Sequence, residues 1–102
     1  MINEKDFSSK IELTGFRGID ESSMDIIIKN INRHGRRIAE LCKNMEKLHI
    51  TLKLIHEREK SEIYDIHAKA VDGGKVYVSH ITDRNLFVAI DKALQKIINE
   101  MD

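Results

Sequence analysis

The side chains in this sequence that could perform chemistry are five histidines and one cysteine. His56, His67 and His80 could come together across neighbouring strands of the predicted sheet as metal ligands. Their spacing matches no metal-binding motif, and neither do the positions of His34 and His49. We therefore expect scattered surface or sheet-edge histidines and no metal site.

Cys42 is the only cysteine, so it has no disulfide partner in the chain, which is typical of a reducing compartment. A nucleophilic role would need a neighbouring base and a lowered thiol pKa. Its place on an apolar helical stripe predicts a buried small hydrophobe instead. The sequence also has no P-loop, dinucleotide-binding glycine motif, nucleophile elbow or zinc-protease helix motif. We predict that the protein is not an enzyme, binds no small-molecule substrate and carries no cofactor.

Basic residues are concentrated in one segment of a chain whose formal net charge is zero. From Ile28 to Lys53 seven lysines and arginines stand against two acidic residues, a net charge of +5. Residues 1–27 carry three basic and six acidic side chains (net −3), and residues 54–102 carry seven and nine (net −2). This asymmetry predicts a local basic surface for an anionic partner.

Arginines stand at the centre of the basic segment. Arg33, Arg36 and Arg37 fall within five residues, and no acidic residue follows them before Glu40. Arginine binds phosphate through paired hydrogen bonds, so such a face suits a nucleic-acid backbone rather than base sequence. The alternative interpretation is an ordinary solvated helix face. The few aromatic residues do not form the adjacent pairs on strands that base stacking requires.

The first half of the chain predicts one strand and one long helix. Residues Lys10–Phe16 alternate polar and apolar side chains, as a half-buried strand does. Apolar residues then recur at three- and four-residue steps, which predicts a helix over 22–44 with N-cap candidates in Asp20–Ser23 and a C-cap at Asn44. Gly35 lies on the apolar stripe, so we expect close packing there.

The second half predicts three consecutive strands and a second helix. The expected segments are a strand over 48–54, a charged loop over 57–61, and strands at Glu62–Val71 and Lys75–Ile81. Asp72-Gly73-Gly74 predicts a tight hairpin turn. On the last strand we expect Val76 and Val78 to point inward. Asp83 is the expected N-cap of a helix whose apolar repeat runs to Met101.

The resulting order is β-α-β-β-β-α, which predicts an α+β fold with a four-stranded, mainly antiparallel sheet and two helices packed on one face. We expect one domain over residues 1–102, in which residues 1–8 form a loose N-terminal extension. The sequence shows neither the order of a signal peptide nor an apolar run of about 18 residues. We therefore expect a cytoplasmic protein with no membrane partner.

Two segments resemble the ribosome hibernation-promoting factor family, whose members are also called ribosome-associated inhibitors. Val71–Ser79 contains a Gly-Gly hairpin followed by an alternating strand. Asp83–Asp91 (DRNLFVAID) is similar to the family's helix opening, in which Asp is followed by Leu or Met, an aromatic residue, any one residue and then Ala-Ile-Asp. The family has the same β-α-β-β-β-α order, so the resemblance extends over nearly the whole chain after Lys10.

The resemblance implies a protein that binds the small ribosomal subunit and its rRNA, and inhibits translation during stress or stationary phase by occluding the mRNA and tRNA channel. In the family, basic residues of both helices contact rRNA, and its lysines match His34, Arg37 and Lys96 here. The basic segment and the second helix supply the other residues of the predicted RNA-binding set. The predicted RNA-binding set is Lys29, Arg33, His34, Arg36, Arg37, Lys43, Lys47, Lys92 and Lys96.

The chain departs from the family at its C-terminal end, where Asn99, Glu100 and Asp102 stand in place of a basic continuation. It also has no C-terminal dimerisation domain, so it resembles the short form of the family, and pairing of ribosomes would need another protein partner. These departures leave an alternative open. The chain would then be a divergent member that acts as a protein-interaction or regulatory module without binding ribosomes.

Overall fold

Six elements follow one another in the predicted order in the computed structural model, which describes residues 10–56 and 62–102. They are β1 (Ile11–Thr14), α2 (Glu21–Leu41), β2 (Met45–His56), β3 (Glu62–Asp72), β4 (Lys75–Asp83) and α3 (Leu86–Met101). The extension expected at 1–8 and the loop expected at 57–61 lie outside the described residues.

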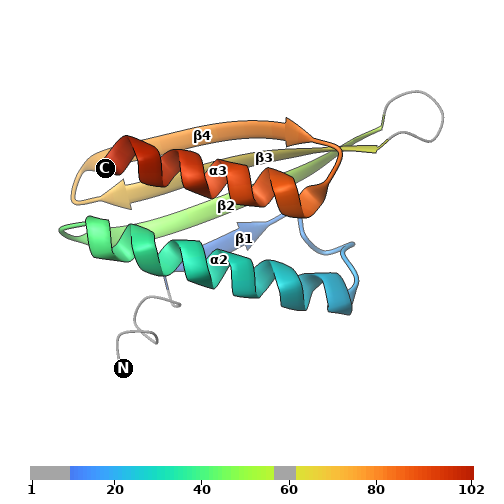
Figure 1. The fold of residues 1–102 in the computed structure, drawn as a ribbon, viewed down its shortest axis with the longest axis horizontal. Helices are drawn as coiled ribbons and strands as arrows, with labels where there is room; N and C mark the ends of the chain where they lie inside the picture. The colour runs from blue at the N-terminus through green and yellow to red at the C-terminus, as the bar shows by residue number, and fades with distance from the viewer. Residues whose placement is uncertain (1–9, 57–61) are drawn as a thin grey trace.

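The four strands form one mixed sheet in the order β1-β2-β3-β4. β1 pairs with β2 in parallel, and the other two pairings are antiparallel. Both helices lie side by side on the same face of this sheet (Figure 1). The predicted fold class is therefore confirmed.

Alternate residues of the central strands point toward the helices and form the core. On β2 the buried residues are Leu48, Ile50 and Leu52, and on β3 they are Ile66, Ala68 and Ala70. The helices contribute Ile27, Ile31, Ile38, Ala89, Ile90, Ala93, Leu94, Ile97 and Ile98 to the same cluster. Burial of each large side chain stabilises the fold by about 1.5–3 kcal/mol. Leu54 is 45% exposed, because β2 and β3 continue beyond the helices (Figure 1).

Helix α2 begins where the sequence predicts and ends earlier. The carboxylate of Asp20 accepts a hydrogen bond from the amide of Ser23 at 3.0 Å, and this bond lowers the pKa of Asp20. Gly35 is buried within the helix, as expected. The predicted C-cap at Asn44 is wrong, because the helix ends at Leu41 with Cys42 as the cap.

Hydrogen bonds to Asp72, at the turn of the β3–β4 hairpin, explain why α2 ends early. The carboxylate of Asp72 accepts hydrogen bonds from the amides of Lys43 at 3.1 Å and Asn44 at 2.7 Å. These amides are thereby bonded to a side chain instead of to carbonyls of the preceding helical turn. The chain therefore leaves the helix there and enters β2 at Met45.

The prediction that Val76 and Val78 point inward is wrong, since they are 53% and 57% exposed. The tight turn pairs Asp72 with Lys75, and this register places Tyr77 opposite the buried Ala70. Val76 then lies opposite Val71, on the outer face. The inner face of β4 instead carries Ser79, whose buried hydroxyl donates a hydrogen bond to the carbonyl of Ala93 at 2.8 Å.

Helix α3 starts two residues later than expected. β4 continues to Asp83, and the N-cap is Asn85, whose side-chain oxygen accepts from the amide of Val88 at 3.1 Å. Asp83 instead accepts a hydrogen bond from the amide of Asn85 at 2.8 Å, which fixes the turn between strand and helix.

The helices in the described part of the chain do not reach the combination of length and apolar content that crossing a membrane requires.

We predict that Gly15→Ala destabilises the protein by more than about 2 kcal/mol. Gly15 has a φ of +88°, and a Cβ there would lie 2.1 Å from the carbonyl oxygen of Leu52 in β2. Urea denaturation measures the free energy of unfolding. Gly18→Ala is the matched control, because its added Cβ meets no atom within 4 Å and should change stability by less than about 0.5 kcal/mol. Equal stabilities of the two variants would contradict the close approach of Gly15 to β2.

Candidate nucleic-acid interface

The exposed side of α2 carries a stripe of four basic residues, Lys29, Arg33, Arg36 and Arg37, which we call the α2 stripe. At 100° per residue these four positions fall within about 100° of the helix circumference. The stripe lies opposite the buried isoleucines of the same helix, and all four residues are exposed. The Arg33 side chain is 71% accessible, so its guanidinium can meet an external anion.

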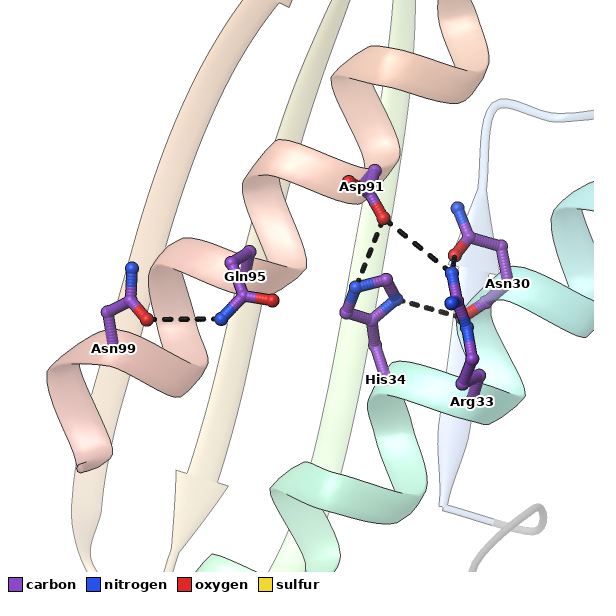
Figure 2. Close-up of polar contacts among 6 residues, drawn as sticks. All are labelled: Asn30, Arg33, His34, Asp91, Gln95 and Asn99. Carbon is purple, nitrogen blue, oxygen red and sulfur yellow. Dashed lines mark hydrogen bonds and ion pairs between the residues drawn. The ribbon is translucent and has the colours of Figure 1, made fainter.

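His34 does not lie on this exposed face, and its predicted placement beside the arginines is wrong. It is one of the buried residues of α2 and is only 8% exposed. Its Nε2 lies 3.1 Å from a carboxylate oxygen of Asp91 in α3, and its Nδ1 lies 3.1 Å from the carbonyl oxygen of Asn30 (Figure 2). The ring therefore links the backbone of α2 to the carboxylate of α3.

Acidic side chains lie near Arg33 and Arg37 of the α2 stripe. Arg33 donates a hydrogen bond to the side chain of Asn30 at 2.8 Å and lies 3.8 Å from Asp91 (Figure 2). Arg37 lies 3.4 Å from Glu40 on its own helix and 4.0 Å from Asp102, the C-cap residue of α3. Exposed ion pairs of this kind contribute at most about 1 kcal/mol, so a phosphate can displace them.

A groove of about 320 Å³ lies between α2 and α3, beside Arg33 and Arg37. Its lining consists of Arg33, His34, Arg37, Gln95, Ile98, Asn99 and Asp102. The side-chain amide of Gln95 donates to that of Asn99 at 3.1 Å on the α3 side (Figure 2). The groove is therefore cationic along α2, and it is amide-rich with one carboxylate along α3.

The predicted α3 lysines lie away from this groove. Lys92 is exposed, and its ammonium group lies 3.8 Å from Asp83 at the end of β4. Lys96 is also exposed and stands one helical turn later, so it lies on the same side of α3 as Lys92. The side of α3 that faces α2 carries Asp91 instead, and the two lysines form a separate small basic area.

Lys43 and Lys47 are separate from both areas. Lys43 is exposed directly after α2 ends. Lys47 alternates with the buried Leu48, so it lies on the outer face of the sheet, where its ammonium group is 3.9 Å from Glu12. The structure therefore brings four of the nine predicted residues into one stripe and distributes the others.

Sequence reasoning missed Asp91, which contacts both Arg33 and His34. The residue stands in the Asp83–Asp91 segment, where it was noted only as part of a pattern. The helical phase of Asp91 was one available signal for its contact with α2. Asp91 and Lys92 are adjacent in a helix, so their side chains point in different directions and only one of them can face α2. Which of the two faces α2 depends on how the helices pack, and the periodicity of α3 alone does not determine this.

The histidines of the strands are not all scattered, contrary to expectation. His67 and His80 are partners in the β3–β4 register and their rings stack at 4.0 Å, with Asp65 beside them. His49 instead lies 2.8 Å from the hydroxyl of Thr14. The side chain of His56 lies outside the described part of the structure.

Comparison with known proteins gives similarity in structure alone, because no family model and no curated protein sequence matches the chain. A ribosomal subunit interface protein from Coxiella burnetii superposes with a TM-score of 0.61 at 12% identity, covering 89% of this chain and 91% of the other. The N-terminal domain of Protein Y from Thermus thermophilus superposes with a TM-score of 0.53 at 18% identity, with the same coverage of 89% and 91%. At these identities the similarity concerns the fold.

We predict that Cys42 is a poor nucleophile at pH 8. Partial burial of the thiol, together with the nearby carboxylate of Asp72, raises the Cys42 pKa from 9.0 to about 11. The thiolate fraction at pH 8 is then about 100-fold smaller than for an ordinary thiol. The higher intrinsic nucleophilicity of such a thiolate offsets part of this loss, so alkylation by iodoacetamide should be about tenfold slower than in the urea-unfolded chain. A native rate equal to the unfolded rate would contradict the raised pKa.

Proposed function

We propose that this protein binds the small ribosomal subunit through rRNA and inhibits translation during stress or stationary phase by occluding the channel for mRNA and tRNA. The observation that carries the proposal is the α2 stripe, which lies on a fold shared with a protein named for the ribosomal subunit interface. Occlusion requires surface complementarity and no reacting group. The protein would therefore act as a binding module in the cytoplasm and not as an enzyme.

The α2 stripe supports contact with an RNA backbone. Arg33, Arg36 and Arg37 occupy adjacent turns of an exposed helix face, so they can meet successive phosphates of one strand. Binding exchanges weak surface ion pairs for bonds to phosphate, and it releases counterions from the RNA. Lys29 extends the stripe toward the start of the helix.

The other predicted residues have different places in this proposal. Lys43 can extend the contact at the far end of α2, and Lys92 and Lys96 can serve a second strand that passes over α3. We leave His34 out of the contact set, because only 9% of its side chain is accessible. Lys47 is left out because it lies on the outer face of the sheet. His34 instead positions the contact by tying α2 to Asp91.

We predict that changing Arg33, Arg36 and Arg37 together to glutamate abolishes cosedimentation with purified small subunits at about 50 mM salt. For the wild type, binding should fall steeply between about 50 and 200 mM salt, with a log–log slope of about 0.7–0.9 per phosphate contacted. The charge-matched control changes the exposed residues Lys69, Lys75 and Arg84 to glutamate, since none of them belongs to the α2 stripe. Absence of wild-type binding at low salt, or equal losses in both variants, would refute the proposed interface.

We further predict that Asp91→Asn strengthens binding to small subunits up to about fivefold. The substitution removes the carboxylate 3.8 Å from Arg33 and thereby frees its guanidinium for phosphate, a gain of at most about 1 kcal/mol. The asparagine oxygen can still accept a hydrogen bond from His34, so the contact between the helices should persist. Competition sedimentation measures the ratio of affinities. Weaker binding of this variant would show that Asp91 itself belongs to the contact.

A second candidate is a protein-interaction module, which the exposed Ile26 favours. This side chain is 54% exposed and lies on the same side of α2 as the α2 stripe. An apolar residue among cations suits a protein surface with acidic groups better than an RNA backbone. In the cosedimentation experiment, binding that resists salt and the arginine substitutions but is lost in Ile26→Ser would support this second candidate.

A further inference from the structure

The outer face of the sheet holds a cluster of three potential metal ligands on adjacent strands. Asp65 and His67 are two residues apart on β3 and so point to the same side, and His80 on β4 is the register partner of His67. One ligand atom from each residue lies within 4.8 Å of the others. The cluster is therefore fixed by strand pairing and does not depend on a loop.

The carboxylate of Asp65 is the centre of this cluster. One of its oxygens contacts Nε2 of His80 and accepts a hydrogen bond from the hydroxyl of Thr82 at 3.0 Å. The other oxygen lies 3.2 Å from Nε2 of His67. The Thr82 hydroxyl thus helps to orient the carboxylate, as hydrogen-bonding groups around metal sites commonly orient the ligands.

The environment of Asp65 favours a bound cation. The side chain is only 11% accessible. Lys53 is the register partner of Asp65 on β2, yet in the described part of the chain no lysine or arginine forms an ion pair with this carboxylate. A nearly buried carboxylate is thus surrounded by imidazoles and a hydroxyl.

One spacing between ligand atoms is near that required by a small transition-metal ion, and the three atoms lie close enough to be drawn around one ion. Bonds of about 2.0–2.1 Å in tetrahedral geometry place ligand atoms roughly 3.3–3.5 Å apart. The 3.2 Å between Asp65 and His67 is already close to this spacing. The two imidazole rings are stacked at an interplanar angle of 13°, so they must tilt apart before both nitrogens can point at one ion. The His67 and His80 side chains are 51% and 55% accessible, which leaves room for that rotation.

We propose that Asp65, His67 and His80 form a binding site for a divalent transition-metal ion, with Zn²⁺ as the preferred ligand. Two imidazoles and one carboxylate supply three protein ligands, and water completes the tetrahedron from the solvent side. Ions that prefer oxygen ligands, such as Mg²⁺ and Ca²⁺, are disfavoured by the two nitrogens. The site lies on the sheet face opposite the helices, so it is independent of the function proposed above.

The test is isothermal titration of the chelator-treated full chain with Zn²⁺ alone. We expect one saturable site per chain, unaffected by a large excess of Mg²⁺. His67→Ala and His80→Ala should each weaken binding at least about tenfold, because each removes a direct ligand. His49→Ala is the matched control, since His49 lies on the same outer face but contacts Thr14, and it should bind like the wild type.

The two histidine variants remove half-exposed side chains and should unfold as cooperatively as the wild type in thermal melts followed by circular dichroism. Either variant suffices for the test, and the wild-type titration is decisive without them. Absence of saturable Zn²⁺ binding up to about 1 mM would overturn the proposal. So would binding that neither His67→Ala nor His80→Ala weakens, or an equal loss in His49→Ala.

Discussion

The structure depends on the need to cover one apolar face of a four-stranded sheet with two helices. Leu48, Ile50 and Ile66 are wholly buried on that face, and among the described residues α2 and α3 are the helices that exclude water from it. Small residues set how closely α3 approaches. Ala68 and Ala70 of β3 and Ala89 and Ala93 of α3 are buried, and short side chains of this kind let a helix backbone lie near a sheet. The buried hydrogen bond from Ser79 to the carbonyl of Ala93 requires that approach.

The packing of both helices on one face of the sheet also determines the electrostatics of the candidate nucleic-acid interface. Because α2 and α3 lie side by side, the inner flank of each helix meets the other, and Asp91 reaches His34 and Arg33. The predicted basic surface therefore has an inner edge with acidic neighbours and an outward part that faces solvent. Its inner edge is neutralised by carboxylates of α3, while the outward residues of the α2 stripe stay accessible. A chain with no net charge can thus present a cationic strip, because Asp91 stands along its inner edge and Glu40 stands at its C-terminal end.

The sequence predicted the element order and most boundaries, because periodicity reports which residues must be buried. It failed where the answer depended on register or on hydrogen bonds between distant residues. Val76 and Val78 suit an inner face by residue type, yet the turn that pairs Asp72 with Lys75 assigns them to the outer face. The end of α2 depends on the Asp72 carboxylate, which lies 28 residues after Asn44 in the chain.

The candidate site was predicted less completely than the fold, for the same physical reason. Residue type and helical phase were enough to identify Arg33, Arg36 and Arg37 as an exposed group. Helical phase also places His34 beside Ile31 and Ile38 on the buried side, but its polar character favoured the surface. The pairing of His67 with His80 requires the register of β3 with β4, and spacing along the sequence does not contain that information.

The sheet separates the two surfaces that could bind ligands. The α2 stripe lies beyond the helix layer, and the Asp65 cluster lies on the other face of the strands, so at least one packed layer of about 10 Å stands between them. A charge bound at the cluster is therefore separated from the α2 stripe by packed protein. Any coupling would have to pass through β3 and the core residues packed against it, where Asp65 alternates with the fully buried Ile66.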